Sequence, residues 1–74
     1  MAVSWPQLLA ALQECKEVEV HPRGKHFHLK YKFKRADLRR LTGPSDDYKI
    51  KEIRHLVAQL KVDKDIIKKH IPEL

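Results

Sequence analysis

The sequence predicts an α+β domain in which a helix is followed by a three-stranded antiparallel sheet, a second helix and a short extra C-terminal helix. Two patterns carry this prediction. Residues 26–34 alternate between apolar and polar or basic side chains, which is typical of a strand with one buried face. Residues 5–16 and 50–60 instead place apolar side chains at helical spacing. A chain of 74 residues has the length of one domain, 1–74, with the helices covering one face of the sheet.

The first helix is predicted over about residues 5–16. Ser4 can cap it, Pro6 suits its first turn, and Gln7 follows Ser4 at the spacing of a capping box. Leu8 and Leu12 lie on one apolar stripe of this helix, which Cys15 extends.

Three strands are predicted next. The first covers residues 18–21, where Val18 and Val20 share one parity, and it ends in a turn over residues 22–25 that contains proline and glycine. The second covers residues 26–34 and places Tyr31 and Phe33 on the core face. We expect residues 36–37 to reverse the chain, so that residues 38–42 form the third strand.

The C-terminal part of the chain is predicted to be helical. We expect Gly43 and Pro44 to end the sheet and residues 45–47 to supply a helix cap. Ile50, Ile53, Leu56, Val57 and Leu60 then form an apolar stripe, and His55 lies off this stripe, so it is expected at the surface. Asp63 can cap the last short helix, which contains Ile66 and Ile67.

The charge of the chain is basic and concentrated. There are 16 Lys and Arg against 10 Asp and Glu, and residues 22–40 contain eight of the basic residues with Asp37 as their single acid. Such a patch points to a polyanion, which includes nucleic acid, an acidic protein or an anionic membrane. A solvated sheet face with lysines that prevent edge-to-edge aggregation is the structural alternative.

The predicted location is the cytoplasm, without a membrane anchor. No apolar run approaches the ~20 residues that a membrane-spanning helix needs, and the first residues lack the pattern of a signal peptide. A single cysteine, Cys15, excludes an internal disulfide and fits a reducing compartment.

His26 is the candidate catalytic residue. Histidine is the side chain poised to exchange protons near neutral pH, and inside a cationic groove it could act on the 2′-hydroxyl of RNA beside a phosphate. A metal-free ribonuclease needs such a base together with cations for the developing charge. His26 and His28 could instead help to hold a metal, but no acid or cysteine lies close in sequence and the neighbouring cations repel one, so we expect no metal and no cofactor.

The stretches RGKHFHLKY and LRRLTGPSDDYKIKEIRHLVAQLKVDKDIIKKH resemble the HicA family of small toxins. The resemblance implies a fold like a double-stranded RNA-binding domain, ribosome-independent cleavage of mRNA, and neutralisation by a HicB-like antitoxin protein. Gly24 matches the family glycine and His26 the catalytic histidine, whereas Lys25 stands where the family usually has serine. The Val-Pro-x-His element of the family is echoed only by Gly43 and Pro44, with no histidine after them.

The function predicted from the sequence is a metal-independent endoribonuclease with His26 as general base. The residues expected to bind RNA are Arg23, Gly24, Lys25, His28, Lys30, Lys32 and Arg39. Two alternatives remain open: a non-catalytic nucleic-acid-binding module on the same fold, and a protein-interaction domain whose basic face docks an acidic partner.

Overall fold

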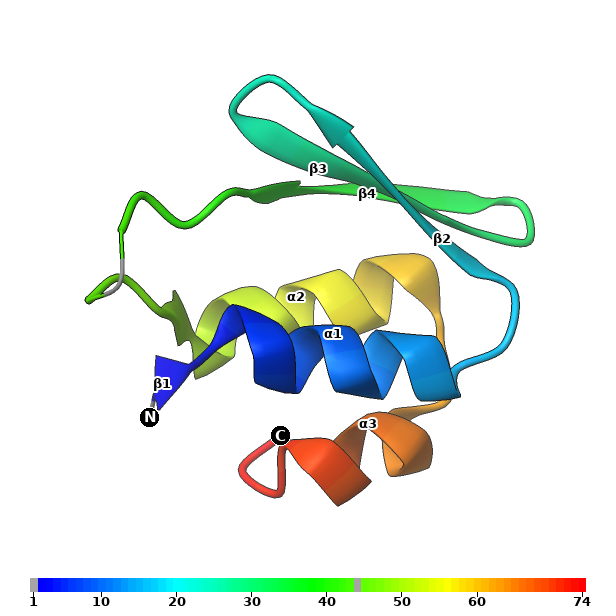
Figure 1. The fold of residues 1–74 in the computed structure, drawn as a ribbon. Coiled ribbons are helices and arrows are strands. Elements are labelled where there is room, and N and C mark those ends of the chain that lie inside the picture. Colours follow the sequence, from blue (N-terminus) through cyan, green and yellow to red (C-terminus); the bar gives the residue numbers. More distant parts are fainter. Residues whose placement is uncertain (1, 44) are drawn as a thin grey trace.

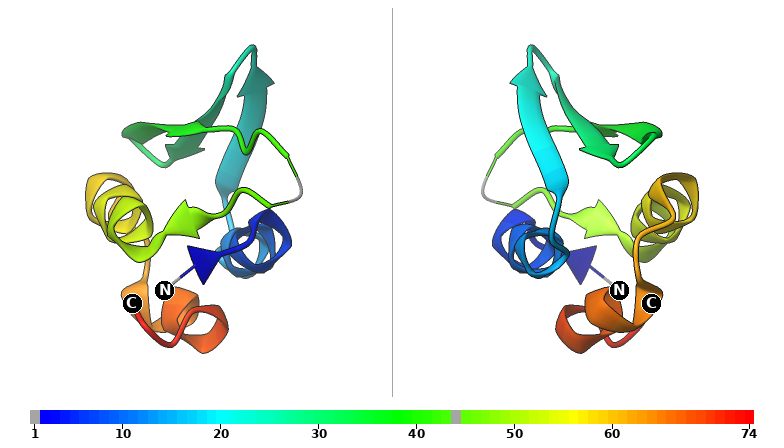
Figure 2. Two further views of the ribbon diagram at one scale, coloured as in Figure 1. Left: turned by 90° about the vertical axis from the view of Figure 1, so that its left-hand side faces the viewer. Right: turned by 90° about the vertical axis from the view of Figure 1, so that its right-hand side faces the viewer.

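A computed structural model describes residues 2–43 and 45–74, and it has the predicted α+β arrangement. The strands form an antiparallel sheet in the order β2-β3-β4. In Figure 1 this sheet lies over α1 and α2, and α3 lies on the far side of these two helices, an arrangement that Figure 2 shows from two further sides. The main elements are α1 (Trp5–Glu14), β2 (Val18–Arg23), β3 (His26–Tyr31), β4 (Lys34–Arg39), α2 (Ile50–Leu60) and α3 (Lys64–His70).

The predicted caps of α1 and α3 are confirmed. The Gln7 backbone N–H donates to Ser4 Oγ at 3.3 Å, and the Asp65 N–H donates to the Asp63 carboxylate at 2.9 Å. The Gln7 side chain does not close a capping box, because its Nε2 donates instead to the backbone oxygen of His70 at 2.7 Å. This bond ties α1 to the C-terminal end of α3.

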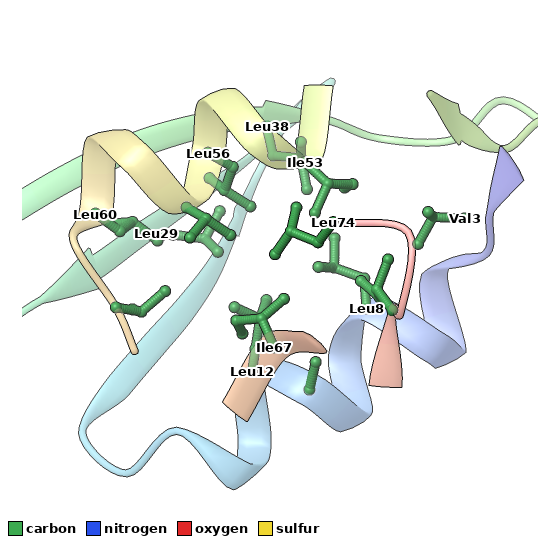
Figure 3. Close-up of a cluster of buried hydrophobic side chains, with 14 of the residues drawn as sticks. Val3, Leu8, Leu12, Leu29, Leu38, Ile53, Leu56, Leu60, Ile67 and Leu74 are labelled. Carbon is green, nitrogen blue, oxygen red and sulfur yellow. The ribbon is translucent and has the colours of Figure 1, made fainter. Parts of the chain in front are cut away.

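One cluster of buried side chains joins the inner face of the sheet to the helices. Figure 3 shows residues from the strands, from all three helices and from the C-terminus pointing into this cluster. At its edge the Trp5 ring stacks on Phe27 of β3, with ring centroids 4.3 Å apart. Every buried side-chain nitrogen and oxygen in the described residues has a hydrogen-bond partner. The fully buried large side chains are Val3, Leu8, Leu12, Leu29, Tyr48, Ile53, Leu60, Ile67 and Ile71.

The position of the third strand was predicted wrongly. The chain reverses at residues 32–33 instead of 36–37, and β4 therefore runs from Lys34 to Arg39 instead of covering residues 38–42. In the observed register Ala36 pairs with Leu29 and Leu38 with Phe27. This register buries Ala36 and Leu38 on the inner face, which a strand beginning at residue 38 would not do.

The early reversal changes the environment of the residues at the turn. Phe33, which parity predicted to be core, is fully exposed, whereas Tyr31 remains packed against the core. Lys32 lies in the turn rather than on the cationic sheet face, and its φ of 54° is left-handed. Alternation along a strand predicts faces only as far as the strand continues, and β3 ends at Tyr31.

A small two-stranded sheet, formed by the N-terminal residues and the residues just before α2, was not predicted from the sequence. Strand β1 (Ala2–Val3) pairs with β5 (Tyr48–Lys49), so α2 begins only at Ile50. Residues 45–47 do not cap α2. The Glu52 carboxylate does so by accepting the Lys49 backbone N–H at 2.7 Å. Pro44, expected to help end the sheet, lies outside the described residues.

None of the helices that the structure describes has the length and apolar composition that crossing a membrane requires.

Candidate functional site

The hairpin turn between β2 and β3 presents the residues on which the ribonuclease hypothesis depends. Gly24 and Lys25 form a two-residue loop, which is closed by the pair of Arg23 and His26. Gly24 has a φ of 57°, as the first position of a type II′ hairpin turn requires. A Cβ atom there would meet nothing within 4 Å, so the backbone conformation rather than space explains the glycine. The turn places Arg23 and Lys25 beside His26.

The outer face of the sheet carries three rows of side chains across β2, β3 and β4. The strand register defines these rows as Arg23, His26 and Arg39; then His21, His28 and Asp37; then Glu19, Lys30 and Arg35. Two of the three rows thus contain a carboxylate. The face is less uniformly cationic than predicted, because β4 begins early enough to bring Asp37 onto it and β2 contributes Glu19.

A pocket of about 580 Å³ lies at the edge strand β4, between the first row of the outer face and α2. The sheet contributes His26, Asp37 and Arg39 to its lining, and β5 and α2 contribute Lys49, Lys51, Glu52 and His55; Leu38 and Leu56 complete it. Two other pockets in the described residues are smaller, with volumes of about 450 and 190 Å³. It brings the predicted catalytic histidine together with groups that lie more than twenty residues away in sequence.

His26 and His55 differ from the other three histidines of the chain. His28 Nδ1 lies 2.8 Å from the Asp37 carboxylate, while His21 contacts Glu19 and His70 contacts Glu14 through their Nε2 atoms, at 3.2 and 2.7 Å. Neither His26 nor His55 makes a side-chain hydrogen bond or ion pair with any residue that the structure describes. The two imidazoles that line the pocket are therefore the two in which both ring nitrogens are without a partner among the described residues.

The guanidinium of Arg39 forms ion pairs with Asp46 and Glu52 that hold the fold together. Its Nε donates to Glu52 at 2.7 Å, one terminal nitrogen donates to Asp46 at 2.9 Å, and the other donates to the Asp47 backbone oxygen at 2.9 Å. The hydrogen bond from Arg39 is the largest cause that lowers the pKa of Glu52. The pKa of Asp46 is lowered first by the Thr42 backbone N–H and then by Arg39. Arg39 thus joins the end of β4 to α2 and leaves little of its guanidinium for a phosphate.

The predicted RNA-binding residues are spread along the whole sheet. Arg23, Gly24 and Lys25 lie at the end that carries His26, and His28 is in the middle row, held by Asp37. Lys30 is in the third row, between Glu19 and Arg35. Lys32 belongs to the opposite hairpin turn (Figure 1). A single pocket therefore collects only part of the predicted set.

The pocket includes three basic residues, Lys49, Lys51 and His55, that were not among the site residues predicted from the sequence. His55 was correctly placed at the surface, and Lys51 lies one helical turn before it on the same side of α2. Lys49 lies just before α2, in β5. The spacing of Lys51 and His55 is a sequence signal for a shared helix face, but only the packing of α2 beside β4 brings this face to His26.

The chemistry available at the pocket is proton transfer and anion binding. Two imidazoles lie among three cationic side chains, Lys49, Lys51 and Arg39, and two carboxylates, Asp37 and Glu52. In the described part of the chain, no three His, Cys, Asp or Glu side chains form a group that could hold a metal ion. Cys15 is buried, and burial raises the pKa of its thiol, so it behaves as a small core residue.

No protein-family model, no curated protein and no solved structure matches this chain.

Proposed function

We propose that the protein is an endoribonuclease that needs no metal ion and acts at the pocket between β4 and α2. The observation that carries the proposal is that His26, the histidine singled out from the sequence, lines a pocket with a second histidine and two lysines. Both imidazoles are without side-chain partners among the described residues. Groups that transfer protons, beside groups that bind a phosphate, are what cleavage of RNA at its 2′-hydroxyl requires.

In the proposed reaction the two histidines have opposite roles. The neutral ring of His26 accepts the proton of the 2′-hydroxyl, and the 2′-oxygen forms a bond to the adjacent phosphorus. The bond from phosphorus to the 5′-oxygen breaks, and protonated His55 donates the proton that this oxygen takes up. The products are a 2′,3′-cyclic phosphate and a 5′-hydroxyl end. Lys49 and Lys51 lie where they can stabilise charge on the phosphate oxygens, while Arg23 and Lys25 flank His26 from the hairpin.

The proposal changes the role expected of Arg39. Its ion pairs with Glu52 and Asp46 make it a residue that positions α2, and thereby His55, against β4.

The resemblance to HicA toxins agrees with this fold and with His26, and it adds mRNA as the substrate and a HicB-like antitoxin as a partner. We further infer action in the cytoplasm, where a buried free thiol such as Cys15 stays reduced.

The test is cleavage of end-labelled RNA in EDTA by the wild type and by His26→Ala, His55→Ala and His21→Ala. We expect the first two variants to cleave about 10²- to 10⁴-fold more slowly, the usual contribution of a general acid or base. His21 is the matched control because it lies on the same sheet face but outside the pocket, and its variant should cleave within about two-fold of the wild type. Products that end in a 3′-hydroxyl, or full activity of His26→Ala, would rule out this mechanism.

A non-catalytic RNA-binding module is the second candidate. It is favoured by Asp37 and Glu52, because these two carboxylates oppose the approach of a phosphate to the histidines of the pocket, whereas the basic side chains of the β2–β3 turn lie outside the pocket lining and can still bind RNA. A binding assay beside the cleavage assay separates the two functions. Binding by the wild type and by His26→Ala, without cleavage by either, would assign this second function.

A further inference from the structure

Phe33, at the turn between β3 and β4, neither packs against the core nor lines the proposed active site. Its side chain is fully exposed, and it is the only large hydrophobic residue in the described chain for which this is so. The tertiary structure gives it no packing partner, although the other aromatic side chains contact the core: Trp5, Phe27, Tyr31 and Tyr48. An exposed aromatic ring that the fold does not use is a candidate contact for a ligand.

Two features distinguish the turn that contains Phe33: a lysine in the left-handed conformation and a run of basic side chains on both sides of the ring. The preceding residue, Lys32, has a φ of 54°, a conformation that the first hairpin gives to Gly24. Basic side chains surround the ring in sequence, and residues 30–36 contain no acid. In the strand register Glu19 lies opposite Lys30 and is bonded to His21. Glu17 comes directly before Val18, which pairs with Tyr31, and Glu17 and Tyr31 line one pocket. We call Lys30, Lys32, Phe33, Lys34 and Arg35 the hairpin tip.

We propose that the hairpin tip is a second RNA-binding site, at which the ring of Phe33 stacks on an unpaired base while the surrounding cations hold the flanking phosphates. This rests on the proposed function in so far as the ligand is RNA. Stacking of bases on aromatic rings combined with cationic contacts to the backbone is how proteins bind single strands without reading sequence. The site would recognise single-stranded RNA of any sequence.

The distance between the hairpin tip and the pocket predicts how long an RNA must be to reach both sites. His26 begins β3 and Phe33 follows its end, so at about 3.4 Å per strand residue the two are roughly 20 Å apart. At the spacing of about 3.4 Å per nucleotide along one strand of a stacked duplex, this distance corresponds to roughly six nucleotides. Between them the outer face carries the row of His28, which is bonded to Asp37, and the row of Lys30 and Arg35, whose carboxylate Glu19 is bonded to His21, so the cations of the latter row continue the path of the strand. A flat membrane would contact the tip alone, and this continuity favours RNA as the occupant.

The experiment measures binding of unstructured RNA of twelve and of four nucleotides, about twice and about two-thirds of the predicted span. All proteins carry His26→Ala, which prevents cleavage during the measurement. Phe33→Leu keeps an apolar side chain but removes the flat ring, and Phe33→Trp keeps a ring and adds a fluorophore. We expect Phe33→Leu to weaken binding of the twelve-nucleotide RNA by roughly 5- to 100-fold. The four-nucleotide RNA should be weakened less, because it can occupy the tip or the pocket but cannot span both. The longer RNA should quench the emission of the indole that Phe33→Trp introduces.

The outcomes separate this proposal from the proposed function. Equal affinity of Phe33→Leu and its parent for the longer RNA overturns the stacking site, whatever the cleavage assay shows. A loss that is larger for the longer RNA supports the site even if the wild type does not cleave. If phosphatidylserine vesicles shift the emission of the introduced indole to the blue, and RNA does not quench it, the tip would instead be assigned to an anionic membrane. The emission of Trp5, which is stacked on Phe27, reports whether the parent and Phe33→Leu are folded.

Discussion

Tyr48 connects the core to the ion pairs beside the candidate site. Its ring is completely buried, and its hydroxyl donates to the Arg39 backbone oxygen at 2.7 Å. The Arg39 guanidinium lies 5.3 Å from the centre of the same ring, and burial raises the pKa of Tyr48 to about 12. The tyrosine therefore stays neutral at all physiological pH values and holds the end of β4 where Arg39 can reach α2.

Removing this hydroxyl should destabilise the fold. In Tyr48→Phe the Arg39 carbonyl loses its donor inside the protein, and we expect the free energy of unfolding in urea to fall by about 1–2 kcal/mol. Tyr31→Phe is the matched control, because Tyr31 is half-buried and its hydroxyl makes no hydrogen bond to a described residue; its effect should stay within about 0.5 kcal/mol. Equal effects of the two substitutions would contradict the role assigned to the Tyr48 hydroxyl.

At the scale of the elements, several turns are built from residues in the left-handed conformation. Gly24 fits this conformation, whereas Glu17, Lys32 and Lys61 adopt it at a cost, since each carries a Cβ atom. Lys61 is the clearest case: it ends α2 with a φ of 57°, its side chain is exposed, and its backbone N–H still donates to Val57. Helix α2 thus ends by the usual mechanism but with a residue type that strains it.

Glycine at the end of α2 should therefore stabilise the protein. We expect Lys61→Gly to raise the free energy of unfolding by about 0.5–1 kcal/mol, because relief of the left-handed strain exceeds the added entropy of the unfolded chain. Gln59→Gly, at an exposed position inside the same helix, should lower it by about 1 kcal/mol. The comparison needs only urea unfolding followed by circular dichroism, and a loss of stability in Lys61→Gly would disprove the strain.

At the scale of the whole molecule, ion pairs determine how the stability of the folded state depends on pH. The chain carries a formal net charge of +6 at pH 7. Against this general repulsion, Arg39 joins β4, the following loop and α2 through Asp46 and Glu52, whose pKa values are both lowered in the folded state. A carboxylate with a lowered pKa contributes stability above its unfolded pKa, and this contribution is lost as the pH falls through the folded value.

The contribution of these carboxylates should consequently be lost below about pH 4.5, where they begin to take up protons on unfolding. The measurement is the urea midpoint between pH 7 and pH 3. The variant Asp46→Asn with Glu52→Gln should begin with a lower midpoint at pH 7 and show a shallower fall in acid. If the wild type and this variant fall in parallel, the acid sensitivity comes from other groups.

The local patterns of the sequence predicted the helices, the caps at Ser4 and Asp63 and the polar outer parity of β3. Each of these depends on spacing within one segment, and side-chain direction repeats with a fixed period there. The sequence could also place His55 at the surface, but not opposite any particular strand.

Only the tertiary structure decided where β3 ends, because the register that pairs Ala36 with Leu29 and Leu38 with Phe27 is chosen by what it buries. That choice exposes Phe33, brings Asp37 to the outer face and sets β4 beside α2, so that His26 and His55 line one pocket. The sequence alone therefore determined the helices and the polar outer face of β3. The pairing of distant segments determined the candidate site, since the free energy of burying a shared core depends on residues that no local window contains.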